Sequence, residues 1–128
     1  MKVFFTDRMV AESSSFSPSA HKPLAAVRSW QALGIPFELV EPEAVTIDQF
    51  ALAHDRLFVE EVLSGKRENG FGNRSSAIAA SLPYTSGSLL AAARSAIQDR
   101  GIAVAPCSGF HHAGYASVGG FCTFNGLM

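Results

Sequence analysis

"SGFHHAGYASVGGFCTFN", residues 108–125, combines two adjacent histidines, four glycines and a cysteine with no Lys, Arg, Asp or Glu. The segment follows an apolar run, Ile102 to Ala105, which we predict to be a β-strand. In open parallel sheets, ligands bind in the crevice outside the carboxyl ends of the strands. The sequence therefore places side chains capable of proton transfer where such a fold would hold a site.

The rest of the chain alternates between strand and helix patterns. The predicted strands are 2–6, 36–40 and 102–105, and the predicted helices are 23–33, one from Thr46, 55–62 and 86–100. Thr46 and Gln49 have the spacing of a capping box, and Asp55 can cap the following helix. Gly34 and Gly65 can end helices. This order predicts an α/β fold with a doubly wound, largely parallel sheet.

Length and composition indicate one domain, residues 1–128. A chain of 128 residues is long enough for a single core. Charged residues make up only 16% of the chain, against 48% hydrophobic residues, and the 10 Lys and Arg and 11 Asp and Glu form no block of one sign. We therefore expect neither a nucleic acid nor a membrane as partner.

The cysteines and the amino-terminal segment indicate a cytoplasmic location. Cys107 and Cys122 lie 15 positions apart without a CxxC spacing, which argues against a disulfide framework and against a structural zinc site. The opening MKVFFTDRMV has only a short apolar run before Asp7, too short for the core of a signal peptide. We expect a soluble protein of the reducing cytoplasm.

Two motifs around the opening segment resemble a known family. Pro106 with GFHHA (109–113), followed by GFCTFN (120–125), is similar to the paired signature of the zinc-dependent histone deacetylase superfamily, which includes acetoin-utilisation and acetylpolyamine amidohydrolase relatives. The resemblance implies the arginase/deacetylase type of α/β fold. Weaker similarity extends to three upstream segments: His54-Asp55, residues 69–72, and residues 85–88 at the expected start of helix 86–100.

The resemblance implies catalytic roles for the two histidines. His111 would lie near the zinc-bound water and influence its protonation, and His112 would be the general base and acid. Imidazole exchanges protons near neutral pH, which suits both roles. The implied substrate is an acetylated lysine or a small acetylated amine.

The same resemblance assigns roles to four residues of the second motif. Gly120 would offer backbone contact to the acyl-lysine stem, Phe121 would form one wall of a narrow apolar substrate channel, and Cys122 would lie near the channel floor. Asn125 would give structural support at the start of the next helix. Phe121 and Phe124 could equally be core residues, because a channel wall and a core position look alike in sequence.

The family also implies zinc (Zn²⁺) as cofactor, yet the sequence suggests no metal ligand. In the family an Asp, a His two residues later and a second Asp hold the metal, all downstream of the GFCxxN element, as is the tyrosine that polarises the substrate carbonyl. The sequence given ends at Met128, and the upstream candidates lack compact spacing: Asp7, His21, Asp48, His54 and Asp55. We therefore expect an incomplete fold, no tightly held zinc and no hydrolysis by this chain alone.

Two other functions remain open. The chain could be a non-catalytic interaction or acyl-chain-binding module, or a metal-free hydrolase in which Cys107 or Cys122 acts with His112. Packing is the more ordinary role of a free cysteine. We also expect the chain to self-associate, because a parallel sheet with an uncovered edge exposes apolar surface and unpaired backbone groups.

Overall fold

A three-stranded parallel sheet organises the molecule. The computed structural model describes residues 1–13, 15–107 and 110–128, and its strands are β1 (Lys2–Phe4), β2 (Glu38–Val40) and β3 (Ala103–Val104). Their order in the sheet is β2-β1-β3, with Val3 of β1 opposite Leu39 on one side and Val104 on the other. The predicted α/β class with a parallel sheet is thus confirmed.

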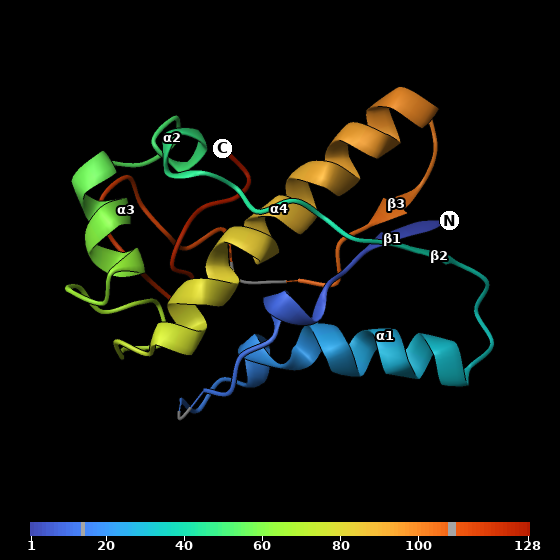
Figure 1. Cartoon of the computed structure of the whole chain (residues 1–128), viewed down its shortest axis with the longest axis horizontal. Coiled ribbons are helices and arrows are strands. Elements are labelled where there is room, and N and C mark those ends of the chain that lie inside the picture. Colours follow the sequence, from blue (N-terminus) through green and yellow to red (C-terminus); the bar gives the residue numbers. More distant parts are fainter. Residues whose placement is uncertain (14, 108–109) are drawn as a thin grey trace.

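The described residues also form four α-helices and two short 3₁₀ helices. They are η1 (Asp7–Met9), η2 (Pro18–Ala20), α1 (Lys22–Ala32), α2 (Ile47–Phe50), α3 (Arg56–Leu63) and α4 (Ser76–Asp99). The sheet lies between α4 and α1, and α2 and α3 gather at the end of the molecule away from the strands (Figure 1). The order of strands and α-helices matches the one predicted. No helix in the described parts of the chain is both long and apolar enough to cross a membrane.

Local sequence signals account for most of the helix ends. The Thr46 hydroxyl accepts a hydrogen bond from the Gln49 backbone N–H, and the Gln49 side chain accepts one from the Thr46 N–H, which completes the predicted capping box. The Asp55 carboxylate caps α3 by accepting from the Phe58 N–H at 2.9 Å. Gly34 and Gly65 follow α1 and α3 with φ of +68° and +75°, conformations that glycine adopts without strain.

The prediction for the long helix was wrong at its start. α4 begins at Ser76, ten residues before the expected position, and residues 85–88 lie inside it rather than at its opening. Ser75 caps the helix by accepting from the Ile78 N–H, and Pro83 is accommodated within it. The helix ends with Arg100 in the left-handed region at φ 49°, although Gly101 is the residue suited to that conformation. The start of α4 thus follows the Ser75 cap, although Pro83 and Gly87 lower the helix propensity of its first half.

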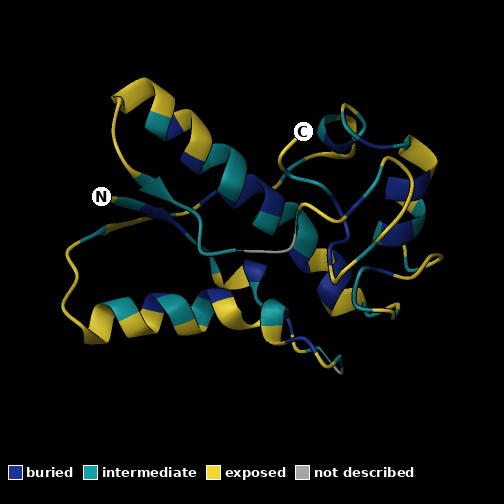
Figure 2. Ribbon diagram, turned by 180° about the vertical axis from the view of Figure 1, so that it is seen from behind, coloured by how far each residue is buried: buried dark blue, intermediate teal, exposed yellow. Residues whose placement is uncertain are grey.

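The core contains two clusters, and Leu82 of α4 packs against both. One joins α2, α3 and the carboxyl-terminal segment through Phe50, Phe58, Val59, Val62 and Phe124, and the Phe50 and Phe124 ring centroids are 4.4 Å apart. The other contains Ala11, Ala20 and Ile78. Buried residues run along the middle of α4 (Figure 2). The central helix thus connects the sheet to the segment that carries the two sequence motifs.

Gly87 permits the closest backbone approach to α4. A Cβ atom at this position would lie 1.9 Å from the Glu43 carbonyl oxygen, so the segment before α2 would have to move. We expect Gly87→Ala to destabilise the protein by about 3 kcal/mol, at the upper end of overpacking costs, which corresponds to about 10 °C in melting temperature. Circular dichroism melts check this value. Gly101→Ala is the control, because its Cβ would meet only the Asp99 carbonyl at 3.8 Å; equal losses in both variants would contradict the packing argument.

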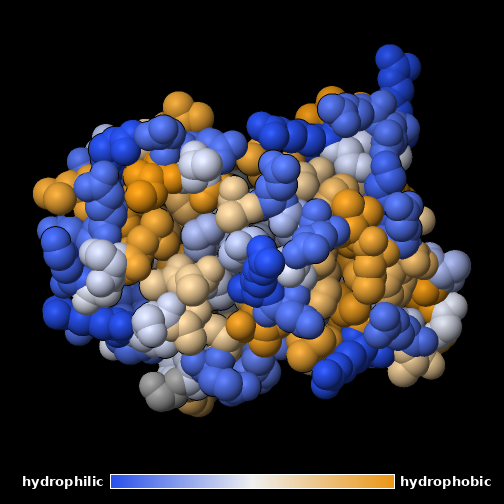
Figure 3. All heavy atoms as spheres, viewed as in Figure 1, coloured by the Kyte–Doolittle hydropathy of each residue, from blue (hydrophilic) through white to orange (hydrophobic). Residues whose placement is uncertain are grey.

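Self-association remains a prediction. Within the described residues β3 pairs with β1 alone, and Ile97 and Ile102 beside it are each 78% exposed. Apolar side chains reach the surface between hydrophilic ones (Figure 3). Because open strand edges and apolar patches promote association, we expect dimers or larger species at high protein concentration. Light scattering that finds a stable monomer under those conditions would contradict the prediction.

Candidate active site

The histidine pair lies on a compact loop that follows β3. The rings of His111 and His112 have centroids 3.9 Å apart and an interplanar angle of 45°, and both residues are exposed. Two isolated backbone bridges shape the loop after them, one between Gly114 and Ser117 and one between Gly119 and Cys122. The predicted catalytic pair is therefore accessible on ordered backbone. Residues 108 and 109, which begin the quoted segment, lie outside the described residues.

A glycine pair forms the surface on which His112 rests. A Cβ on Gly120 would lie 2.7 Å from Cδ2 of His112, and one on Gly119 would lie 2.8 Å from the His112 carbonyl oxygen. Gly120 has φ of +51°, and Gly119 exchanges two backbone hydrogen bonds with Cys122. A larger residue at Gly120 would displace the imidazole, and one at Gly119 would press against the His112 carbonyl oxygen. Gly120, expected to contact the substrate stem, thus contacts a predicted catalytic side chain in this structure.

Phe121 adopts a backbone conformation that is uncommon for a bulky residue. Its φ is +63°, in the left-handed region, and its side chain is 41% exposed. Its ring centroid lies 6.3 Å from that of Phe71, which comes from the loop between α3 and α4. Strain of this kind in a folded protein often accompanies a functional role. Phe121 and Phe71 form an aromatic pair next to the histidine loop.

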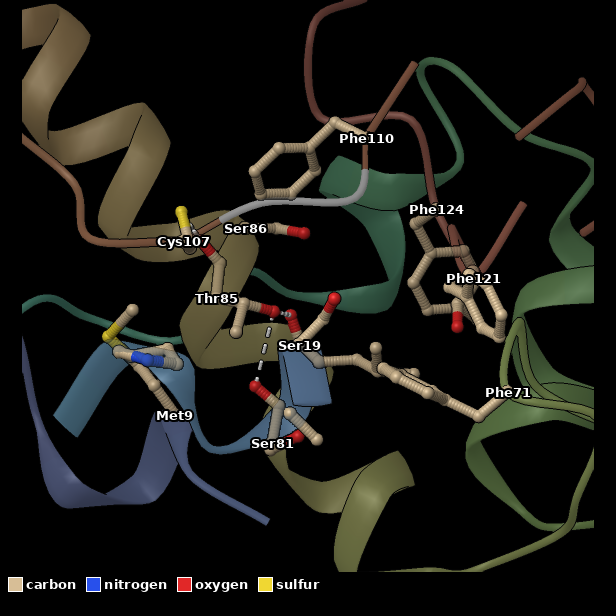
Figure 4. A pocket seen from close by; sticks show the side chains of 14 residues that line it. Met9, Ser19, Phe71, Ser81, Thr85, Ser86, Cys107, Phe110, Phe121 and Phe124 are labelled. Carbon is tan, nitrogen blue, oxygen red and sulfur yellow. Dashed lines mark hydrogen bonds between the residues drawn. The ribbon is translucent and has the colours of Figure 1, made fainter. Parts of the chain in front are cut away.

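Below this pair lies a cavity of about 40 Å³. Met9 and Cys107 lie at the opposite side from Phe121, and Phe110 lies at the top of the view (Figure 4). The fourteen lining residues come from η1, η2, α1, α4 and the two loops: Met9, Ser19, Ala20, Pro23, Phe71, Ser81, Leu82, Thr85, Ser86, Cys107, Phe110, Phe121, Thr123 and Phe124. Of the three residues assigned to a channel from sequence, Phe121 is among them, and Gly120 and Cys122 are not. Sequence reasoning missed Met9 and Phe110, whereas Phe71 belongs to the 69–72 segment of weaker resemblance.

Both cysteines are in surroundings that suit packing. Cys122 is 1% exposed, and its thiol lies 3.6 Å from the Gly120 carbonyl oxygen. Burial raises the pKa of the Cys107 thiol to about 12, which outweighs the opposing effect of a hydrogen bond with Ser88. Because the thiolate is the nucleophile, a thiol with this pKa is unreactive near neutral pH. The environment of Cys107 therefore argues against the metal-free cysteine hydrolase.

Alkylation of the native protein tests this conclusion. A pKa raised to about 12 means less thiolate at pH 8, so Cys107 should react with iodoacetamide on the order of 10³-fold more slowly than a free cysteine. The rate should rise about tenfold per pH unit as long as the fold persists. Peptide mass spectrometry measures each cysteine separately, with urea-unfolded protein as the control. Rapid native modification of Cys107 at neutral pH would support the cysteine hydrolase instead.

Asn125, the last residue of the second motif, forms two side-chain hydrogen bonds. The Asn125 side-chain amide donates to the Ala113 carbonyl at 3.2 Å, and its Oδ1 accepts from the Leu127 N–H at 3.1 Å. Asn125 therefore ties the residue after His112 to the end of the loop. The supporting role expected of this residue and the helix expected after it both stay predictions.

The described residues do not fit a zinc site. No three His, Cys, Asp or Glu side chains among residues 1–13, 15–107 and 110–128 come together in a way that could hold a metal ion. A catalytic zinc site requires about three protein ligands and one open position.

Comparison with known proteins agrees with the motifs and the fold. The family model for the histone deacetylase domain matches residues 16–128. The chain belongs to the histone deacetylase family. The matched range includes both motifs, the cavity residues from Ser19 onward and all four α-helices. Among curated proteins, no sequence matched this chain.

Two crystal structures share the fold of this deacetylase family member. The HDA15 HD domain superposes with a TM-score of 0.77 at 17% identity, over 98% of this chain and 40% of that one. The acetylpolyamine aminohydrolase from Burkholderia pseudomallei superposes with a TM-score of 0.69 at 20% identity, over 99% of this chain and 50% of that one. The chain therefore spans 40 to 50% of the length of these two structures.

Proposed function

We propose that this chain supplies the acid–base part of a metal-dependent deacetylase or related amidohydrolase. The observation that carries the proposal is the exposed His111–His112 pair, with ring centroids 3.9 Å apart, on the loop that also carries Phe121 above a small cavity. The family membership of the chain supports a hydrolytic role for this pair. The proposed substrates are amides of acetylated lysine or of small acetylated amines.

In the proposed reaction His112 carries the proton. A water molecule adds to the amide carbonyl carbon and loses a proton to the His112 imidazole; the C–N bond then breaks, and the leaving amine takes that proton. Such transfers contribute about 10² to 10⁴ in rate. His111, whose ring faces that of His112, would influence the protonation of the same water. Zinc, which the family implies, would activate this water, but the described residues offer it no site.

The aromatic residues favour a slender, aliphatic substrate. Phe71 and Phe121 present apolar rings beside the histidine loop, which suits the methylene groups of a lysine or polyamine stem. The cavity below them is small, about 40 Å³, which favours a compact acyl group. We therefore propose an acetyl group in preference to a longer acyl chain.

A chimera tests the proposal. Residues 1–128 would be joined to the part of the Burkholderia pseudomallei aminohydrolase that this chain does not match, and the product assayed with a fluorogenic acetyl-lysine amide and with an acetylated polyamine. We expect multiple turnover that a chelator abolishes and zinc restores. The matched control carries both His111→Ala and His112→Ala and should be inactive.

The same chimera distinguishes the non-catalytic alternative. A folded, zinc-loaded chimera that binds acetylated amines without hydrolysing them would favour a binding module on this scaffold. Circular dichroism and metal analysis establish folding and zinc content before the assay. Without that evidence of folding, a new junction would be chosen before any conclusion about activity.

A further inference from the structure

His54 is the buried histidine among the four in this chain, and both of its ring nitrogens are occupied. It lies between α2 and α3 with 1% of its surface exposed. Nε2 accepts a hydrogen bond from the Asn125 backbone N–H at 2.8 Å, and Nδ1 lies 3.1 Å from the Tyr115 carbonyl oxygen. A backbone N–H can only donate, so Nε2 is bare and Nδ1 carries the proton. The contacts therefore specify a single neutral tautomer.

These two hydrogen bonds reach the loop of the histidine pair at two places. The Tyr115 carbonyl oxygen also accepts a hydrogen bond from the Asp55 N–H at 3.0 Å. His54 Nδ1 and the Asp55 backbone nitrogen therefore both bond to this one oxygen. Asn125, at the far end, donates from its side chain to the carbonyl of Ala113, the residue after His112. One imidazole thus bonds the segment 113–125 near its start and at its end, and the Asn125 side chain joins that end to Ala113.

Further contacts within the segment 113–125 link these hydrogen bonds to the position of His112. Gly119 and Cys122 are joined by two backbone hydrogen bonds, of 3.0 and 2.7 Å, and the glycine pair supports the His112 ring. A second contact comes from Gly70, whose N–H donates to Thr123 Oγ1 at 2.9 Å and whose Cβ, if present, would lie 2.5 Å from the Cys122 carbonyl carbon. The loop therefore has little freedom between its two anchors.

We propose that His54 is a positioning residue that sets the orientation of His112 through this loop. The inference rests on the proposed function of His112, but His54 itself touches neither the substrate nor the reacting atoms. Its role goes beyond filling the core beside Phe58 and Phe124, whose ring centroids lie 5.9 and 5.5 Å from its own. A leucine would fill similar space, yet would leave the Asn125 N–H without its acceptor in the core.

Nuclear magnetic resonance on the 128-residue chain tests the proposal without zinc or substrate. In protein labelled with ¹⁵N-histidine, His54 should show a protonated Nδ1 and a bare Nε2. His54→Leu should accelerate amide exchange at Asn125 about tenfold or more and shift the ring signals of His112. His54→Gln, which retains a side-chain acceptor, should restore both toward the original values. His21→Leu, at an exposed position whose side chain caps nothing, is the matched control.

Two results would overturn the proposal. One is a His54 ring protonated at Nε2; the other is a folded His54→Leu variant with unchanged Asn125 exchange and unchanged His112 signals. If the leucine variant does not fold, the tautomer and the glutamine variant decide the question. Because these signals are independent of turnover, an inactive chimera would count against the proposed function and leave this inference standing.

Discussion

Replacing His112 with alanine in the active chimera should lower turnover by about 10²- to 10⁴-fold, the contribution typical of a general acid or base. His112 is exposed and lies against the Gly119–Gly120 backbone, so truncation removes the proton carrier without opening a core cavity. We therefore expect the fold and the bound zinc to persist. The loss should appear in kcat, because the proton moves during the chemical steps.

Metal content and two further variants make this result interpretable. Plasma emission spectrometry should find as much zinc in His112→Ala as in the parent chimera, because His112 is proposed to move a proton and not to bind metal. His111→Ala should also reduce turnover, whereas His21→Ala, at an exposed position, should not. Loss of zinc together with activity would identify His112 as a ligand and contradict its assignment.

The 128-residue chain by itself should neither hold zinc tightly nor hydrolyse acetyl-lysine amides. Of its four histidines, His54 already uses both ring nitrogens, and the adjacent His111 and His112 stand without a third ligand nearby in the described parts of the chain. Two neighbouring imidazoles without further ligands fall short of a catalytic zinc site. We therefore expect all of the zinc-dependent activity of the chimera to be absent from the 128-residue chain.

A quantitative assay is needed for this prediction, because weak binding by exposed histidines is common. Zinc titration of the pure chain would be paired with turnover of a fluorogenic acetyl-lysine amide, with and without a chelator. One zinc held tightly per chain, together with chelator-sensitive multiple turnover, would show that residues 1–128 build a complete site after all.

The elements of the fold were largely predictable because their signals are local. The capping box at Thr46, the Asp55 cap and the glycines after α1 and α3 each depend on residues within one helical turn. The start of α4 was missed although Ser75 provides a local cap. Ser, Pro and Gly between Ser81 and Ser88 weaken the helix pattern, and the packing of the Glu43 carbonyl against Gly87 becomes visible only in three dimensions.

In the candidate site, too, residues close together in the sequence were predictable and contacts between distant residues were not. The motifs identified the histidine pair, Phe121 and Asn125, because these residues lie within one short segment. The cavity combines that segment with η1, η2 and α4, and the two hydrogen bonds of His54 span 61 and 71 residues. Neither composition nor periodicity indicates contacts between residues so far apart in the sequence. From sequence, His54 therefore belonged only to a segment of weak resemblance, and no positioning role could be assigned to it.

The left-handed backbone of Phe121 has a consequence for laboratory evolution. Glycine at this position would relieve strain of about 1 kcal/mol, while removing the ring that faces Phe71. The ring is only 41% exposed, however, and burial of a phenylalanine side chain contributes about 1.5 to 3 kcal/mol, more than the strain that glycine would relieve. Selection for heat resistance should therefore retain an aromatic residue at codon 121 in spite of its left-handed backbone.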